Sequence, residues 1–301
     1  MNSLNVPVFE RLKEIALAAR YEKELKVLVL TAAGDRAFSA GNDVRGGSFT
    51  ASGGGATSRR LQVETIEALD AVPQPLIAAV NGVAYTGALE LLLAADMIVA
   101  AKRAIFCDTH AKLGLVPTWG LSVRLPQRIG LANAKLMSFT GKQYSAEDAA
   151  AIGLVDMVTE DEEMPLVVSE LAAAMAENSS DSIAKQKRMM DMAAKTTARE
   201  ALAWTDETYG FHPGAAKDMA ERMATYDPAR LLVVVCHLTC VPALHVIGFV
   251  VAVPQLVRRG EEQEGGAEAL KLFSSASLSV SNSYSCAPEQ TPHPSQICCP
   301  C

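Results

Sequence analysis

Three short apolar segments limit the fold of this 301-residue chain more than any other feature. Residues 26–31 (KVLVLT), 76–80 (LIAAV) and 96–101 (DMIVAA) are almost continuously apolar and are bounded by polar or glycine-containing chain. A parallel strand that is covered on both faces has this pattern, whereas a strand with one wet face alternates. Helical periodicity accompanies these runs, for example over residues 7–24. The alternation predicts an α/β domain built on a buried parallel sheet.

The later parts of the chain differ from this first part. Residues 165–225 have the pattern of several consecutive helices, so the domain is expected to end in a helical block. Residues 231–257 are apolar without a clear period, and the chain after them is of low complexity. We therefore predict one folded domain over residues 1–228. Residues 229–301 are predicted to be a disordered or aberrant tail that packs poorly on the domain and contributes no ligand.

The apolar part of this tail is long enough to cross a membrane. Pro242, Pro254 and two histidines interrupt it, however, and backbone groups freed inside a bilayer are costly. A membrane anchor is therefore disfavoured but left open as an alternative.

Charge and cysteine content narrow the class of protein. The formal net charge of −7 argues against nucleic acid as the main partner. Cys107 is the one cysteine before the tail, which is typical of a reduced intracellular protein. The cysteines of the tail lack the paired spacing of a zinc finger, so no metal is expected. The N-terminal residues contain no secretory signal and no clear transit peptide, and mitochondrion and cytoplasm both stay open.

Two segments are expected to leave backbone N–H groups free. Residues 37–47 (AFSAGNDVRGG) follow a predicted strand, and small residues there let a ligand approach the backbone closely. Gly87 begins an apolar helix, whose first N–H groups have no partner and whose dipole favours negative charge. Together the two segments could form an oxyanion hole. Taken singly, each is also what an ordinary turn or helix start contains.

Longer stretches of the sequence, taken together, carry a resemblance. The stretches KVLVLTAAGDRAFSAGNDVR, PLIAAVNGVAYTGALELLLAADMIVAA and AIFCDTHAKLGLVPTWGLSVRLPQRIG resemble the enoyl-CoA hydratase/isomerase (crotonase) superfamily, and the resemblance spans residues 2–224. It implies a crotonase-like ββα spiral core and a C-terminal helical region used for trimerisation, giving a homotrimer or hexamer. It also implies an acyl-CoA thioester substrate, as in fatty acid metabolism, with no cofactor beyond the CoA of the substrate.

The resemblance assigns roles to four residues of the two free-backbone segments. Asn42 and Gly87 match the family positions whose backbone N–H groups form the oxyanion hole. Ala40 matches a position that lines the adenine pocket. Arg45 matches a basic position near the CoA phosphates, although a solvated surface arginine is an equal interpretation.

Two further residues match the catalytic pair of the hydratases. Glu90 lies among leucines and matches the first catalytic glutamate; the alternative is a buried glutamate satisfied by backbone groups, because an unpaired buried carboxylate is costly. His110 stands where the second glutamate is expected. It could supply a proton, since histidine titrates near neutral pH, or it could only hydrogen-bond within the pocket with Asp108 orienting it.

The leading hypothesis is an enoyl-CoA hydratase, a lyase that adds water to a 2-trans-enoyl-CoA. Other thioester reactions on the same scaffold, namely hydrolysis, decarboxylation or isomerisation, are alternatives, as is a CoA-binding protein with little turnover. The resemblance also implies an N-terminal β-hairpin that this chain is expected to lack and a C-terminal helix that the tail replaces. Both departures are expected to lower the stability of the domain and its affinity for CoA, and they leave open whether this chain is active as an enzyme.

Overall fold

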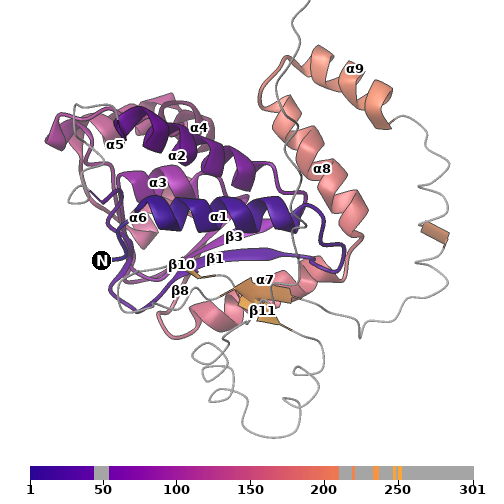
Figure 1. The fold of residues 1–301 in the computed structure, drawn as a ribbon, viewed down its shortest axis with the longest axis horizontal. Coiled ribbons are helices and arrows are strands. Elements are labelled where there is room, and N and C mark those ends of the chain that lie inside the picture. Colours follow the sequence, from indigo (N-terminus) through magenta and orange to yellow (C-terminus); the bar gives the residue numbers. More distant parts are fainter. Residues whose placement is uncertain (44–53, 210–218, 221–232, 237–246, 249, 253–301) are drawn as a thin grey trace, which may run out of the picture.

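The computed structural model describes residues 1–43, 54–209, 219–220, 233–236, 247–248 and 250–252 (Figure 1). The strands of this part of the chain form two sheets. The larger sheet contains, in spatial order, β11 (Val250–Ala252), β9 (Val233–Cys236), β1 (Leu28–Ala32), β3 (Leu76–Val80), β5 (Met97–Ala101) and β8 (Met157–Thr159), and β10 (Ile247–Gly248) also pairs with β1. The central strands β1, β3 and β5 run parallel, as their apolar runs predicted, and β8 pairs parallel with β5.

Helices cover both faces of the large sheet. In Figure 1, α1, α2 and α3 lie above the strands, and α7 lies below them. The helices are α1 (Val6–Ala19), α2 (Gly54–Asp70), α3 (Gly87–Leu92), α4 (Leu121–Ile129), α5 (Leu131–Thr140), α6 (Ala146–Ala151), α7 (Met164–Ala176), α8 (Ser180–Ala193) and α9 (Ala198–Tyr209), with a 3₁₀ turn η1 (Ala111–Leu113).

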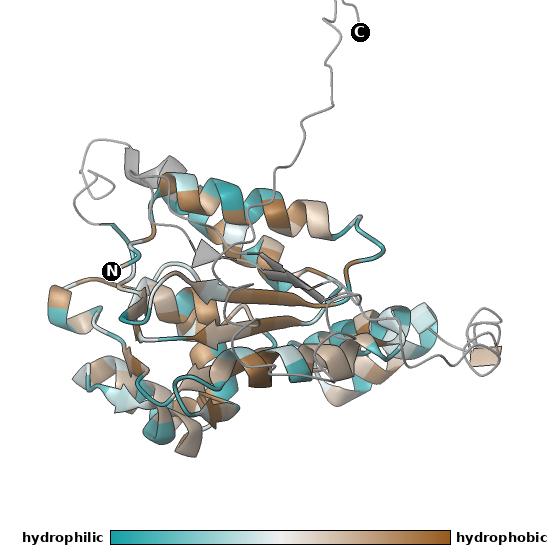
Figure 2. Cartoon of the chain, turned by 90° about the horizontal axis from the view of Figure 1, so that it is seen from below, coloured by the Kyte–Doolittle hydropathy of each residue, from teal (hydrophilic) through white to brown (hydrophobic). Residues whose placement is uncertain are grey.

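Alternate residues of β1, β3 and β5 belong to two separate apolar clusters. Leu30 of β1 is in the cluster that contains Phe9 of α1, whereas its neighbour Val29 is in the cluster that contains Val168 of α7. Figure 2 shows the apolar colour concentrated on these central strands. Burial on both faces explains why the sequence of each strand has no polar alternation.

The second sheet is built from short strands that follow those of the first. Its strands are β2 (Ala37–Ser39), β4 (Val83–Tyr85), β6 (Ile105–Cys107) and β7 (Tyr144–Ser145). After each of β1, β3 and β5 the chain enters this second sheet and then a helix, which is the predicted ββα spiral. The turn from β3 to β4 needs a glycine, because a Cβ at Gly82 would lie 2.5 Å from the carbonyl carbon of Arg36.

Helices α7, α8 and α9 form the predicted helical end of the domain. Helix α8 is attached by polar contacts: Lys187 Nζ lies 2.7 Å from Asp96 Oδ2 and donates to the carbonyl oxygen of Gln74 at 3.1 Å. A cleft of about 900 Å³ lies between α8 and the helices α2 and α4, and it contains none of the candidate catalytic residues. The use of this region in trimer formation concerns contacts between chains and stays a prediction.

The described part of the tail pairs with the large sheet. Leu28 of β1 is in register with Val234 of β9, and Ala32 is in register with Ile247 of β10. The sequence did not predict these strands. An edge strand exposes unpaired N–H and C=O groups, and a valine-rich segment suits pairing with them. The rest of residues 229–301 lies outside the described residues, so the prediction for it stays a prediction.

Most of the candidate membrane anchor, residues 231–257, also lies outside the described residues. Over the ranges that the structure does describe, we find no helix with the length and apolar character that crossing a membrane requires.

Truncation after Arg230 should expose the edge of β1. We expect a lower melting temperature and increased self-association, because each lost backbone hydrogen bond costs about 1 kcal/mol and a bare edge pairs with other chains. Light scattering and thermal unfolding measure both effects. Truncation after Ala252 retains β9, β10 and β11 and is the matched control. If both truncations behave like the full chain, the pairing on β1 contributes nothing.

Candidate active site

Two glycines bring the two predicted oxyanion segments into contact. A Cβ added to Gly41, whose φ is +90°, would lie 2.8 Å from the carbonyl oxygen of Tyr85 and 3.1 Å from the backbone nitrogen of Gly87. Conversely, the backbone nitrogen of Asn42 lies 3.4 Å from the place of a Cβ on Gly87. The backbone nitrogens of Asn42 and Gly87 therefore lie close to one another, and only glycine at position 41 allows that approach.

Among the described residues, neither of these two backbone N–H groups has an acceptor. On either side of Asn42, the carbonyl oxygen of Gly41 accepts from Leu4 at 2.8 Å, and the N–H of Asp43 donates to Leu4 at 2.8 Å. None of the described residues accepts the N–H of Asn42 itself. Gly87 is the first residue of α3, so its N–H has no acceptor within the helix.

Thr86, which precedes α3, has an unusual backbone conformation. Its φ of +56° lies in the region that favours glycine, and a β-branched residue is rare there. Its N–H donates to the carbonyl oxygen of Cys107 at 2.9 Å, which fixes the start of α3 against β6. Such backbone strain costs about 1–3 kcal/mol and is common at active sites, where a backbone group must be held in a fixed direction.

Glu90 is buried in α3, with 2% of its surface exposed. Its Oε1 accepts backbone hydrogen bonds from Trp119 at 2.7 Å and from Leu121 at 3.3 Å. Its Oε2 faces the Nε2 of His110 at 3.6 Å. Burial raises the pKa of Glu90, although the two backbone donors and His110 oppose the shift. Oε1 is thus satisfied by backbone donors, as one interpretation of the sequence expected. Oε2 accepts none of these backbone hydrogen bonds and faces His110.

His110 is held between two carboxylates. Its Nδ1 lies 2.6 Å from Asp108 Oδ1, and the same oxygen accepts the backbone N–H of His110 at 3.1 Å. Burial acts to raise the pKa of Asp108, but hydrogen bonds from His110 and Ser138 outweigh it and hold that pKa below its usual range. An ionised Asp108 accepts the Nδ1–H, so the Nε2 of the ring faces Glu90.

Two residues of the site were not predicted from the sequence. The indole Nε1 of Trp119 donates to Gln62 Oε1 at 2.9 Å, and Gln62 Nε2 donates to Asn42 Oδ1 at 3.3 Å. Together with the bond from the backbone of Trp119 to Glu90, they connect the oxyanion segment to the buried carboxylate. The only feature of the sequence that could have pointed to them is the tryptophan at position 119. It comes directly before Gly120, which caps the start of α4.

The structure describes one of the two further residues that were predicted to contact CoA. Ala40 adjoins the oxyanion segment, and its N–H donates to the carbonyl oxygen of Met1 at 2.9 Å. Its role at an adenine pocket stays a prediction. Arg45 lies outside the described residues.

The ββα spiral and this site define a member of the crotonase class. The chain belongs to the enoyl-CoA hydratase/isomerase family, whose profile matches residues 1–228. It is 32% identical over 208 residues to the putative enoyl-CoA hydratase/isomerase YngF of Bacillus subtilis, covering 69% of this chain and 80% of that protein. It is 28% identical over 210 residues to the short-chain-enoyl-CoA hydratase of Clostridium acetobutylicum, covering 70% and 80%. The crystal structure of enoyl-CoA hydratase from Bacillus anthracis superimposes with a TM-score of 0.70 at 29% identity, covering 74% of this chain and 87% of that one.

Substitution of Gly87 by alanine should disturb this site and the packing beside it. The added Cβ would lie 2.5 Å from Cζ3 of the Trp119 ring, so the indole must move. We expect the free energy of unfolding to fall by about 1–3 kcal/mol, as for other overpacked cores. Denaturant titration measures this loss, and fluorescence of Trp119 in a Trp204→Phe background reports the displacement of the ring. Unchanged fluorescence and stability would contradict the contact.

Proposed function

We propose that the protein is an enoyl-CoA hydratase that adds water across the double bond of a 2-trans-enoyl-CoA. The observation that carries this proposal is the approach of two available N–H groups, on Asn42 and Gly87, within a site that also holds the facing pair of Glu90 Oε2 and His110 Nε2. Family membership and the names of the relatives support it. The reaction needs no cofactor beyond the CoA of the substrate.

The thioester oxygen would lie between the N–H groups of Asn42 and Gly87. Attack of water on the β-carbon makes an enolate, and its negative charge develops on that oxygen. Two preorganised donors stabilise the charge, and the loss of one such donor typically lowers the rate by about 10²–10³-fold. Because both donors are backbone groups, the side chain of Asn42 acts only by holding its own backbone in place.

Glu90 and His110 divide the two proton transfers. Ionised Glu90 accepts a proton from water through Oε2, while the oxygen of that water bonds to the β-carbon. Protonated His110 donates from Nε2 to the α-carbon, which restores the neutral thioester. Glu90 is then protonated and His110 is neutral, and the short path from Oε2 to Nε2 returns the proton for the next cycle.

Asp108 orients the ring in this scheme. Its hydrogen bond to Nδ1 leaves Nε2 as the nitrogen that faces the reacting carbon. It touches no reacting atom and is therefore a positioning residue.

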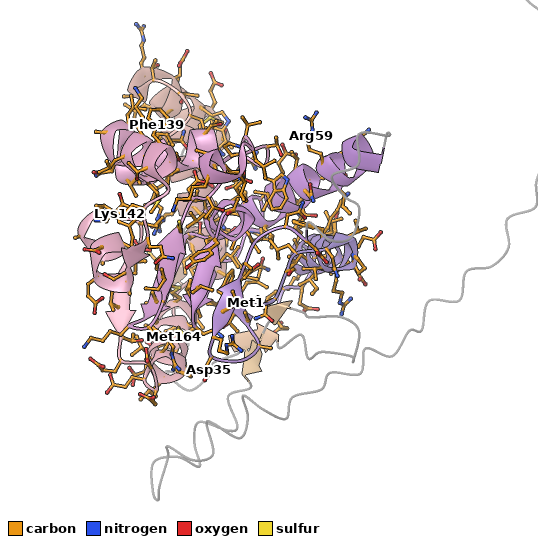
Figure 3. The ribbon with its side chains drawn as sticks, turned by 90° about the vertical axis from the view of Figure 1, so that its left-hand side faces the viewer. Met1, Asp35, Arg59, Phe139, Lys142 and Met164 are labelled. Atoms are coloured by element: carbon orange, nitrogen blue, oxygen red, sulfur yellow. The ribbon has the colours of Figure 1, made fainter. Side chains whose placement is uncertain are left out.

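We also propose that the chain assembles as a homotrimer or hexamer. The resemblance implies this assembly, and exposed apolar side chains on α5 support it. Leu131, Leu136 and Phe139 are 59%, 54% and 75% exposed. Phe139 lies on the opposite side of the sheets from Met164 of α7 (Figure 3).

A panel of CoA thioesters followed by mass spectrometry tests the function. Hydration adds the mass of one water to an enoyl-CoA. Release of free CoA would instead indicate hydrolysis, loss of carbon dioxide would indicate decarboxylation, and a shifted double bond would indicate isomerisation. Binding without any product would support the CoA-binding alternative.

The Glu90→Gln variant should lose hydration by about 10²–10⁴-fold, the usual contribution of a general base. Its raised pKa means that Glu90 contributes stability below the pKa of the unfolded chain and loses it as pH rises through the folded pKa. At neutral pH the glutamine variant should therefore be at least as stable as the parent. Turnover and thermal unfolding measure the two effects, with Glu14→Gln, at an exposed position on α1, as control. Full activity in folded Glu90→Gln would remove this residue from the mechanism.

The His110→Gln variant should separate the two proton transfers. In deuterated water, exchange of the α-proton of butyryl-CoA should persist in Glu90→Gln and disappear in His110→Gln. Because His110 lowers the pKa of Glu90, its removal should also move the acid limb of any residual hydration to higher pH. Mass spectrometry and a pH–rate profile give these readouts. Undiminished exchange in His110→Gln would show that the proton reaches the α-carbon from another group.

A further inference from the structure

Trp119 contacts both halves of the proposed site. Its ring atoms Cζ3 and Cη2 lie 2.5 and 2.8 Å from the place of a Cβ on Gly87, so the indole packs directly on the oxyanion glycine. Its backbone N–H donates to Glu90 Oε1 at 2.7 Å. The residue is 5% exposed.

The indole is fixed by further contacts from two helices. Gln62 of α2 accepts from its Nε1 at 2.9 Å, and Gln62 is itself 5% exposed. Phe9 of α1 packs edge-on against the ring, with centroids 5.0 Å apart and planes at 77°. The second hydrogen bond of Gln62, to Asn42 Oδ1, joins this support to the oxyanion segment. A ring held by hydrogen bonding and close packing does not move aside at low cost.

The position of the ring limits what the site can hold. A thioester with its oxygen on the N–H groups of Asn42 and Gly87 must direct its α- and β-carbons toward Glu90 and His110. The indole packs on Gly87, so a thioester oxygen held by the Gly87 N–H would lie close to the ring, and the acyl group would leave its carbonyl carbon beside it.

We propose that Trp119 is a specificity-determining wall that restricts the acyl group to short chains, with Gln62 as the positioning residue that holds the wall. This inference rests on the proposed function and names its substrate class as short-chain 2-enoyl thioesters. A long acyl group would displace the indole, which breaks the bond to Gln62 and leaves a buried acceptor unpaired. That loss corresponds to about a tenfold or greater preference for the short chain.

Binding of saturated thioesters tests the wall without any turnover. We would measure butyryl-CoA and decanoyl-CoA by calorimetry with the parent and Trp119→Leu, and hydration of crotonyl-CoA and 2-decenoyl-CoA in parallel. The parent should prefer butyryl-CoA, and Trp119→Leu should shift the affinity ratio toward decanoyl-CoA by about tenfold or more. Trp204→Leu, which changes the other tryptophan of the chain on α9, is the matched control and should leave the ratio unchanged.

A parent that prefers decanoyl-CoA, or a folded Trp119→Leu variant with an unchanged ratio, would overturn the proposal. If Trp119→Leu does not fold, Gln62→Leu decides, because it keeps the indole and removes its anchor. It should shift the ratio by about threefold or more, and no shift would overturn the proposal. If the parent protein binds these thioesters but hydrates neither enoyl-CoA, the proposed hydratase function is wrong. The proposal for Trp119 is still tested in that case, because the binding measurements decide it.

Discussion

The close approach of two backbones, at Gly41 and Gly87, is the contact on which the site depends. Neither position has room for a Cβ: one would meet the carbonyl oxygen of Tyr85, and the other would meet the ring of Trp119. The spiral brings these segments together because each follows a strand of the second sheet, β2 in one case and β4 in the other, and these strands are paired. Pairing of β2 with β4 thus fixes the distance between two N–H groups that are far apart in the sequence.

A second constraint is electrostatic. Glu90 and Asp108 are both buried, yet their pKa values shift in opposite directions. Asp108 has hydrogen bonds that keep it ionised, whereas desolvation is the largest influence on the pKa of Glu90. Environments that separate the pKa values of two like groups assign them different tasks. Here Asp108 holds the imidazole of His110, and the proposed mechanism gives the exchange of a proton to Glu90.

The sequence predicted those parts of the fold whose signals are local. The apolar runs of β1, β3 and β5 and the burial of Glu90 were visible in the chain itself. The short strands β2, β4 and β7 were not predicted, because two or three residues carry no periodicity. The helix over residues 7–24 was predicted too long, since α1 ends at Ala19.

Contacts between distant residues were the other limit of sequence-based prediction. Gln62 and Trp119 meet only after α2 packs beside the segment that precedes α4, and no local pattern marks such a pair. The roles of Ala40 and Arg45 depend on a ligand rather than on the chain, so neither local pattern nor packing decides them.

The pairing of Leu28 with Val234 has a consequence for synthesis of the chain. Folding is slow when a contact must close a long loop, because the entropy of closure is lost before the contact forms. During translation, β1, β3 and β5 emerge early and can assemble, while one side of β1 stays unpaired until β9 leaves the ribosome. For that interval the nascent domain exposes a strand edge that suits capture by a chaperone or by a neighbouring nascent chain. The yield of folded protein is therefore expected to depend on translation rate as well as on the stability of the finished fold.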